Sequence, residues 1–228
     1  MIARYAARPA ASVLRTLRAY AEVEDALARE RVAAQEAERG RRLCAAERYE
    51  AYGAAPPLAV SEAVGELLYA LALAHRPQVV VEFGTSHGIS AIYLAAALRD
   101  AGHGRLISAE LLPEKAAAAA ANLAAGGLAD LVEIRAGDAL ATLRDLAEID
   151  VLFLDGRNDL YLDVLHMLEA ALAPTALVLA DLSADDPDLV AYCAHVRAVG
   201  SAYRSQRLLG ESGLEVSFRS CGPSPRRR

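Results

Sequence analysis

The chain has 228 residues, of which 54% are hydrophobic and 24% are charged, a balance that excludes a disordered or fibrous protein and allows a substantial core. Its formal net charge of −6 gives no electrostatic basis for binding nucleic acid. The longest apolar run, at residues 67–74, is far shorter than the roughly 20 residues that span a bilayer. We therefore expect a globular protein of one or two domains whose partners include neither nucleic acid nor a membrane.

The cysteines indicate the compartment. Cys44, Cys193 and Cys221 are far apart, odd in number and outside any Cys-x-x-Cys motif. This spacing favours neither a disulfide framework nor a structural zinc site. A reducing, cytoplasmic location is therefore predicted.

The first 56 residues predict a helical extension before the main domain. Residues 1–20 contain arginines but no acidic residue, as transit peptides do, although their apolar spacing favours an ordinary helix start. Residues 21–50 mix Glu and Arg with few large apolar side chains, as in a helix that is solvated or packs on a partner chain. Gly53 and the prolines at 56–57 then break the helix. We expect this extension (residues 1–56) to form a lid over the site, a dimer surface or both, in a homodimer.

Residues 57–222 show the alternation typical of an α/β domain. Ser61 is placed to cap a helix, and after it short apolar runs alternate with helical segments. The apolar runs predict strands at residues 79–83, 106–109, 131–134, 151–154 and 177–180, and the helical segments end near residues 98, 125, 146, 172 and 199. Continuous apolar strands between helices are typical of a parallel sheet covered on both faces.

The end of the chain departs from this alternation. Residues 201–209 and 213–218 have strand patterns with no helix between them, which predicts an antiparallel hairpin at the sheet edge. Residues 223–228 combine prolines with a run of arginines and predict a disordered tail.

A glycine-rich loop follows the first predicted strand and predicts a cofactor site. Gly84 and Gly88 allow the backbone to turn tightly beside a ligand at the carboxyl end of the strand. A dinucleotide site prefers Gly-x-Gly-x-x-Gly, whereas here an acid, Glu82, precedes a Gly-x-x-x-Gly loop. Glu82 suits the cationic amino group of a methionine moiety, and Glu110, at the end of the second strand, suits ribose hydroxyls. The pattern therefore favours S-adenosylmethionine over a nicotinamide cofactor.

Four segments carry a family resemblance: VVVEFGTSHGIS, LISAELLPEKAAAAAANLAAGGL, IDVLFLDGRNDLYLDVLHMLEAAL and ALVLADLSADDPDLVAYCAHVR. Over roughly residues 57–219 the chain resembles the class I S-adenosylmethionine-dependent methyltransferases, specifically the catechol O-methyltransferase-like family. The resemblance implies the Rossmann-like class I methyltransferase fold, with a seven-stranded mixed sheet. It also implies transfer of a methyl group from S-adenosylmethionine to a hydroxyl of a small molecule.

The resemblance assigns a cofactor pocket. It places the methionine end of the cofactor against the glycine-rich loop, and the ribose and adenine against the ends of the second and third strands. The implied residues are Glu82, Gly84, Ser86, Gly88 and Ser90 for the methionine end, Glu110 for the ribose, Leu111, Asp138 and Ala139 for the adenine, and Asp155, Gly156 and Arg157 at the border of the pocket.

The metal position departs from the family pattern. Asp155 and Asp181 match two cation-binding acids of the family, but the next position, an Asn in the family, is Leu182. Leucine offers no oxygen to a hard cation, so we expect Mg²⁺ to bind weakly or not at all.

The catalytic positions are also altered. Asp155 is retained, but the family's catalytic lysine is replaced by Asn158. The sole lysine, Lys115, lies on the predicted helix after the second strand, where we expect that it cannot take that place. His87 in the glycine-rich loop is either a general base or a hydrogen-bonding residue of the turn, and His195 on the last helix is a second candidate base.

Three alternatives to metal-assisted O-methylation stay open. The altered metal and lysine positions also fit a metal-independent methyltransferase that acts on nitrogen or on an atypical hydroxyl. They fit equally a catalytically inactive homologue that still binds the cofactor. A nicotinamide dehydrogenase is disfavoured by the missing third glycine of the loop.

Overall fold

The computed structural model describes residues 8–184, 186–210 and 213–220, and a seven-stranded sheet is their framework. The strand order is β3-β2-β1-β4-β5-β7-β6. The strands are β1 (Val79–Phe83), β2 (Arg105–Glu110), β3 (Val132–Ala136), β4 (Ile149–Leu154), β5 (Leu172–Asp181), β6 (Tyr203–Leu208) and β7 (Leu214–Arg219). The first five are parallel, while β7 pairs antiparallel with both β5 and β6. The predicted mixed sheet and its hairpin are confirmed.

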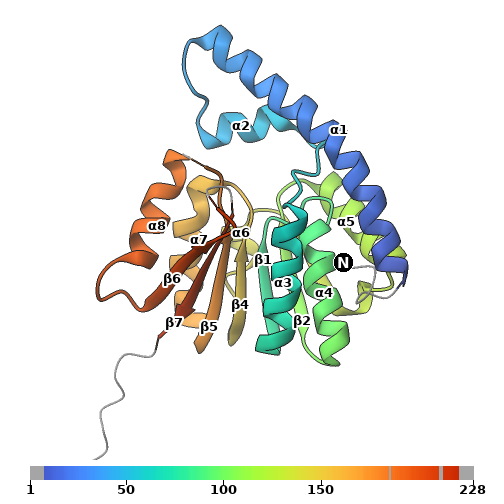
Figure 1. Cartoon of the computed structure of the whole chain (residues 1–228), viewed down its shortest axis with the longest axis vertical. Helices are drawn as coiled ribbons and strands as arrows, with labels where there is room; N and C mark the ends of the chain where they lie inside the picture. Colours follow the sequence, from blue (N-terminus) through green and yellow to red (C-terminus); the bar gives the residue numbers. More distant parts are fainter. Residues whose placement is uncertain (1–7, 185, 211–212, 221–228) are drawn as a thin grey trace, which may run out of the picture.

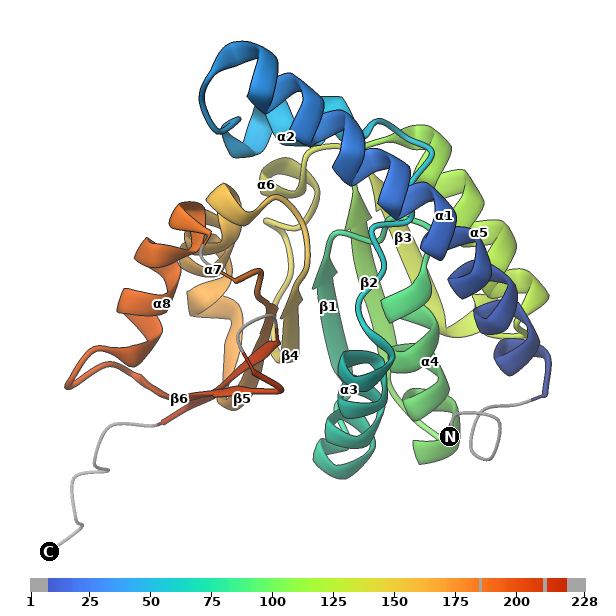
Figure 2. The same ribbon diagram turned by 45° about the horizontal axis from the view of Figure 1, so that its top comes forward.

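Helices cover both faces of this sheet, as Figure 2 shows. On one face lie α3 (Glu62–His75), α4 (Ile89–Ala101) and α5 (Pro113–Ala125), and on the other lie α6 (Ala139–Thr142), α7 (Tyr161–Leu168) and α8 (Val190–Arg197). Short 3-10 turns occupy Ala129–Leu131, Asn158–Leu160, Glu169–Ala171 and Pro187–Leu189. This two-sided cover explains why the parallel strands are almost continuously apolar.

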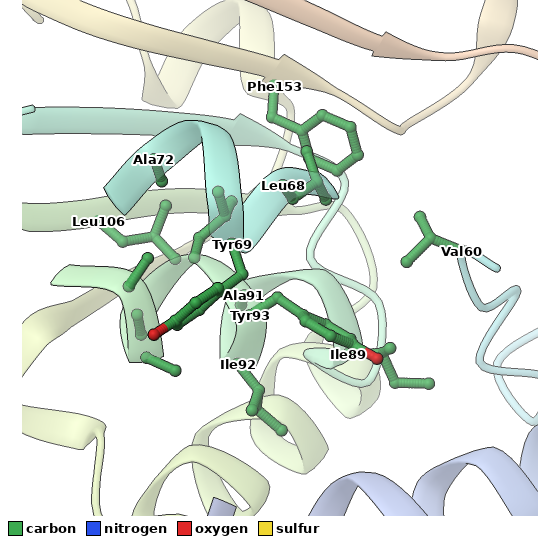
Figure 3. Packing of buried hydrophobic residues seen from close by; sticks show 14 of the residues in the cluster. Val60, Leu68, Tyr69, Ala72, Ile89, Ala91, Ile92, Tyr93, Leu106 and Phe153 are labelled. Atoms are coloured by element: carbon green, nitrogen blue, oxygen red, sulfur yellow. The ribbon is translucent and has the colours of Figure 1, made fainter. Parts of the chain in front are cut away.

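One hydrophobic core lies between α3, α4 and the sheet. Leu68 of α3, Leu106 of β2 and Phe153 of β4 are all fully buried (Figure 3). The Ser61 hydroxyl accepts a hydrogen bond from the Val64 amide, so the predicted cap fixes where α3 begins.

The N-terminal extension forms two helices, α1 (Arg8–Arg39) and α2 (Ala45–Tyr52). Figure 1 shows them above the sheet, with α2 beyond the strand ends and the first half of α1 beside α4 and α5. Leu14 and Leu17 of α1 are buried in the core that includes α4, and Arg18 donates a hydrogen bond to the Tyr93 hydroxyl at 2.9 Å. The extension therefore packs on its own chain.

Some predicted boundaries are wrong. The extension breaks after α1 as well as at Gly53, because Gly40 adopts a left-handed conformation with φ +62°. The helix predicted to end near residue 146 stops at Thr142, and β5 begins five residues before the predicted start. Residues 1–7, the predicted tail at 223–228 and Cys221 lie outside the described residues. In the described part of the chain, no helix is long and apolar enough to cross a membrane.

Candidate functional site

A cavity of about 660 Å³ opens at the carboxyl ends of β1, β2, β4 and β5, beneath α1 and α2. This is where open α/β sheets bind ligands, and the volume suits a nucleotide-sized molecule with a small partner. The predicted residues that line it are Gly84, Ser86, Ser90, Glu110, Leu111, Asp138, Ala139, Asp155, Gly156, Arg157, Asn158 and Asp181. Four other residues considered in the sequence analysis do not line it, namely Glu82, His87, Gly88 and Leu182.

The glycine-rich loop forms part of the cavity floor because two strand ends meet there. Gly84 has φ +102°, and a Cβ atom at this position would lie 2.5 Å from the Asp155 carbonyl oxygen. The Asp155 amide donates to the Phe83 carbonyl at 2.8 Å, which ties the end of β4 to the end of β1. Only glycine allows both this conformation and this approach. Gly88 (φ +87°) then starts α4 without a side-chain cap.

Glu110 is held at the end of β2 by donors from three elements. Its Oε2 accepts the Ser86 amide at 2.7 Å, and its Oε1 accepts the Leu112 amide at 2.9 Å. The Tyr49 hydroxyl of α2 donates to the same Oε1 at 3.3 Å. Two backbone donors fix the carboxylate, while the tyrosine is a side chain that a ligand hydroxyl can replace.

Glu82 lies below the loop rather than in the cavity wall. It is fully buried, and the Ser108 hydroxyl donates a hydrogen bond to its Oε2. Burial raises the pKa of Glu82 to about 7, although hydrogen bonds from Ser108 and Ser90 act in the opposite direction. The side chain predicted to face the methionine amino group thus supports Ser108 and Ser90 from beneath.

Asp155 and Asp181 face the cavity from the ends of β4 and β5, in the arrangement predicted from the sequence. Burial raises the pKa of both carboxyl groups, and the negative charge of Asp181 raises that of Asp155 further. Tyr161 of α7 donates to the Asp181 carbonyl at 3.0 Å and so fixes the end of β5.

The donor set at this pair is incomplete for a hard cation. Leu182 is buried, and its amide donates to the Gly213 carbonyl at 2.8 Å. No group of three His, Cys, Asp or Glu side chains able to hold a metal occurs among residues 8–184, 186–210 and 213–220. Because Leu182 supplies no oxygen where the resemblance implies an Asn ligand, the residues present do not match the cation site of the family, and Mg²⁺ would depend on two carboxylates and water.

The other catalytic candidates have different surroundings. Asn158 lines the cavity, and its Nδ2 donates to Asp186 at 2.8 Å. His87 stacks on Tyr20 of α1, and its Nε2 lies 3.1 Å from the Ala54 carbonyl, so its ring faces the N-terminal extension. Burial lowers the pKa of His87. His195 is not among the lining residues, and its Nε2 lies 3.9 Å from Glu169.

The structure adds lining residues that sequence reasoning missed. Arg48, Tyr49 and Tyr52 come from α2, and Asp25 comes from α1. Their helical spacing alone could not show which face turns toward the sheet. Lys115, which we expected not to replace the family's catalytic lysine, also lines the cavity from the first turn of α5. The sequence signal for this position was that Lys115 follows Glu110 by only five residues and so lies near the end of β2.

Comparisons with known proteins indicate the family. Residues 81–181 match a family of methyltransferase domains. The chain is 32% identical over 160 residues to a catechol O-methyltransferase of Niastella koreensis, a match that covers 68% of this chain and 72% of the relative. It is 41% identical over 107 residues to a catechol O-methyltransferase of Mycobacterium tuberculosis, which covers 46% of this chain and 47% of the relative.

A solved structure shows the same fold. The O-methyltransferase TomG of Streptomyces achromogenes, determined in complex with S-adenosylmethionine, superposes with a TM-score of 0.63 at 27% identity. The match covers 78% of this chain and 86% of TomG. The chain therefore belongs to the catechol O-methyltransferase-like family of class I S-adenosylmethionine-dependent methyltransferases.

Proposed function

We propose that the protein transfers the methyl group of S-adenosylmethionine to a hydroxyl of a small molecule. The observation that carries this proposal is one cavity wall that joins Glu110, at the end of β2, to Asp155 and Asp181, at the ends of β4 and β5. Glu110 suits the ribose of the cofactor, and the pair of Asp155 and Asp181 suits acceptance of the proton that the methyl acceptor loses. The match to catechol O-methyltransferases over most of the chain supports the same reaction.

The cofactor residues proposed from the sequence fit a nucleoside. A ribose diol would donate to Glu110 in place of Tyr49, whose hydroxyl lies 3.3 Å from the carboxylate. Leu111, Asp138 and Ala139 surround the adjacent adenine position, and Ser86 and Ser90 border the methionine end. The bound cofactor supplies the electrophilic methyl group, while these residues orient it toward the acid pair.

The acceptor must lose a proton as its oxygen attacks the methyl carbon. Asp155 is the proposed recipient, because the partly buried acid pair lines the cavity while the ring of His87 faces the N-terminal extension. Asn158 can hold the acceptor hydroxyl by a hydrogen bond but cannot take its proton. The proposed proton transfer involves no metal, because the donor set at Asp155 and Asp181 is incomplete.

Leu182 and Asn158 favour a second candidate, which is metal-independent transfer to nitrogen or to an atypical hydroxyl. Both residues line up with family positions that serve metal-assisted proton removal, and neither can perform it. An inactive homologue that only binds the cofactor remains the third alternative.

Methyl transfer from labelled S-adenosylmethionine separates these candidates. The acceptors are a panel of catechols, other phenols and amines, each tested with Mg²⁺ and with EDTA, using the wild type and Asp155→Asn. We expect O-methylated product that persists in EDTA and is lost in Asp155→Asn. Loss in EDTA would show that two carboxylates suffice for a metal. Cofactor binding without turnover on any acceptor would support the third alternative, an inactive homologue that only binds the cofactor.

The extension is proposed as a lid, and a homodimer is proposed as the assembly. Arg48 of α2 donates to Asp186 and Asp188 at 2.9 Å each, so α2 is fastened across the cavity. On the outer side of α1, Val23 and Leu27 are 58% and 44% exposed, which suits a subunit contact. A monomeric mass in light scattering would refute the dimer. The cytoplasmic location stays a prediction.

A further inference from the structure

Lys115 is a buried ammonium in the wall of the cofactor cavity. It lies in the first turn of α5 and is 2% exposed. Its Nζ donates one hydrogen bond, to the Ser86 hydroxyl at 3.2 Å, and Ser86 in turn donates to the Pro57 carbonyl. An ammonium has three donors, so two of them have no protein acceptor among the hydrogen bonds of the described residues. The negative charges of Glu110, Asp25 and Asp155 act on Lys115 from nearby, but none of these hydrogen bonds joins it to them, so its spare donors are available to an acceptor from a ligand.

The charges around the cavity identify the kind of acceptor. S-adenosylmethionine carries two cationic groups, its sulfonium and its amino group. Acidic residues of the wall, among them Asp155 and Asp181, suit these positive charges. The remaining charged group of the cofactor is a carboxylate, which needs a cation in the wall.

The other cations of the wall are engaged or remote. Arg48 binds Asp186 and Asp188, and Arg157 binds Asp159. Arg29 is exposed on α1 at the outer side of the cavity. Lys115 is therefore the buried cation with donors to spare.

The neighbours of Lys115 place it at the methionine end of the pocket. Ser86 belongs to the loop that precedes α4, and Ile89 and Ser90 in the first turn of α4 line the same cavity. The N-terminus of α4 has no side-chain cap, so its amide donors are open to an anion. A carboxylate bound at this point would contact a helix N-terminus and an ammonium together.

We propose that Lys115 binds the carboxylate of the methionine moiety of S-adenosylmethionine. The proposal rests on the proposed function and deepens it, by assigning a cofactor residue that the resemblance did not assign. Lys115 thereby acts in recognition of the cofactor and takes no proton from the acceptor.

Calorimetry with two probes tests this assignment. S-adenosylhomocysteine carries the carboxylate, and its decarboxylated analogue keeps the amine but lacks the carboxylate. We expect Lys115→Met to weaken S-adenosylhomocysteine by about 10- to 100-fold, the loss typical of a buried hydrogen bond to a charged group, and to change the analogue by less than about threefold. Arg204→Met, which changes an exposed residue of β6 away from the cavity, is the control and should alter neither affinity.

Each further outcome is decisive. Equal losses for both probes, or no loss for S-adenosylhomocysteine, would overturn the assignment of Lys115. Lys115→Gln is tested in parallel, because it keeps a hydrogen bond to Ser86 and guards against a folding defect in Lys115→Met. If the wild type binds neither probe, the proposed function itself fails. If it binds both and Lys115→Met weakens them equally, only the role of Lys115 fails.

Discussion

Replacing Glu82 by glutamine should stabilise the protein at alkaline pH and leave it unchanged in acid. Glu82 is 0% exposed, and burial raises its pKa from 4.5 to about 7. Glutamine is the isostere of the protonated carboxyl group, so Glu82→Gln keeps the hydrogen bond from Ser108 but cannot ionise. The variant therefore isolates the free energy of burying this charge.

The sign and size follow from the two pKa values of Glu82. The folded state binds the proton more tightly than the unfolded state, so the stabilising effect of the neutral form is complete below pH 4.5. This stabilisation is lost as the pH rises from 4.5 to about 7, and above pH 7 the unfolding free energy changes no further on account of Glu82. The difference corresponds to about 3 kcal/mol of unfolding free energy, which Glu82→Gln should regain.

Urea unfolding followed by circular dichroism measures this effect. The wild type, Glu82→Gln and the control Glu114→Gln, which changes an exposed residue of α5, are compared from about pH 5 to about pH 8. The advantage of Glu82→Gln over the wild type should grow with pH, while the control follows the wild type. Parallel curves, or a glutamine variant less stable than the wild type at pH 8, would refute the reasoning.

Three further substitutions test the cavity. Glu110→Gln should weaken S-adenosylhomocysteine by about 10- to 100-fold in calorimetry, and an unchanged affinity would contradict the ribose assignment. Gly84→Ala should cost about 2 kcal/mol more in urea unfolding than Gly127→Ala, because both have positive φ but a Cβ at Gly127 meets nothing within 4 Å. Equal costs would rule out the clash. Arg48→Met should free α2 from its ion pairs with Asp186 and Asp188. We then expect faster proteolysis of the extension and a higher KM, and an unchanged rate of cleavage would argue against the lid.

Local patterns in the sequence predicted the sheet well. The first strand, Val79–Phe83, has the predicted bounds, because a buried parallel strand is a nearly continuous apolar run, here interrupted only by Glu82. The hairpin at the end of the chain was predicted for a similar reason, since no helix could fit between β6 and β7. The strand ends then carried Glu110, Asp155 and Asp181 to one edge of the sheet, as the topology of parallel strands requires.

The cavity wall was predicted less completely, because its outer half is made by contacts between distant segments. Arg48 bonds to Asp186, which is 138 positions away in the chain. Lys115 was considered only as a replacement for the catalytic lysine, and its contact with Ser86 in the cavity wall was not foreseen. His87 has a loop position that suits a base, but the N-terminal extension takes its hydrogen bond.

The sequence by itself determined the fold class, the order of strands and helices, and the acids at the strand ends, because these follow from local periodicity and from motifs that span a few residues. Only the tertiary structure decided which side of α1 and α2 faces the sheet, which lysine donors remain unused, and that Glu82 lies beneath the cavity. These features depend on how side chains from separate elements share space, hydrogen bonds and charge, and no single segment of the chain contains that information.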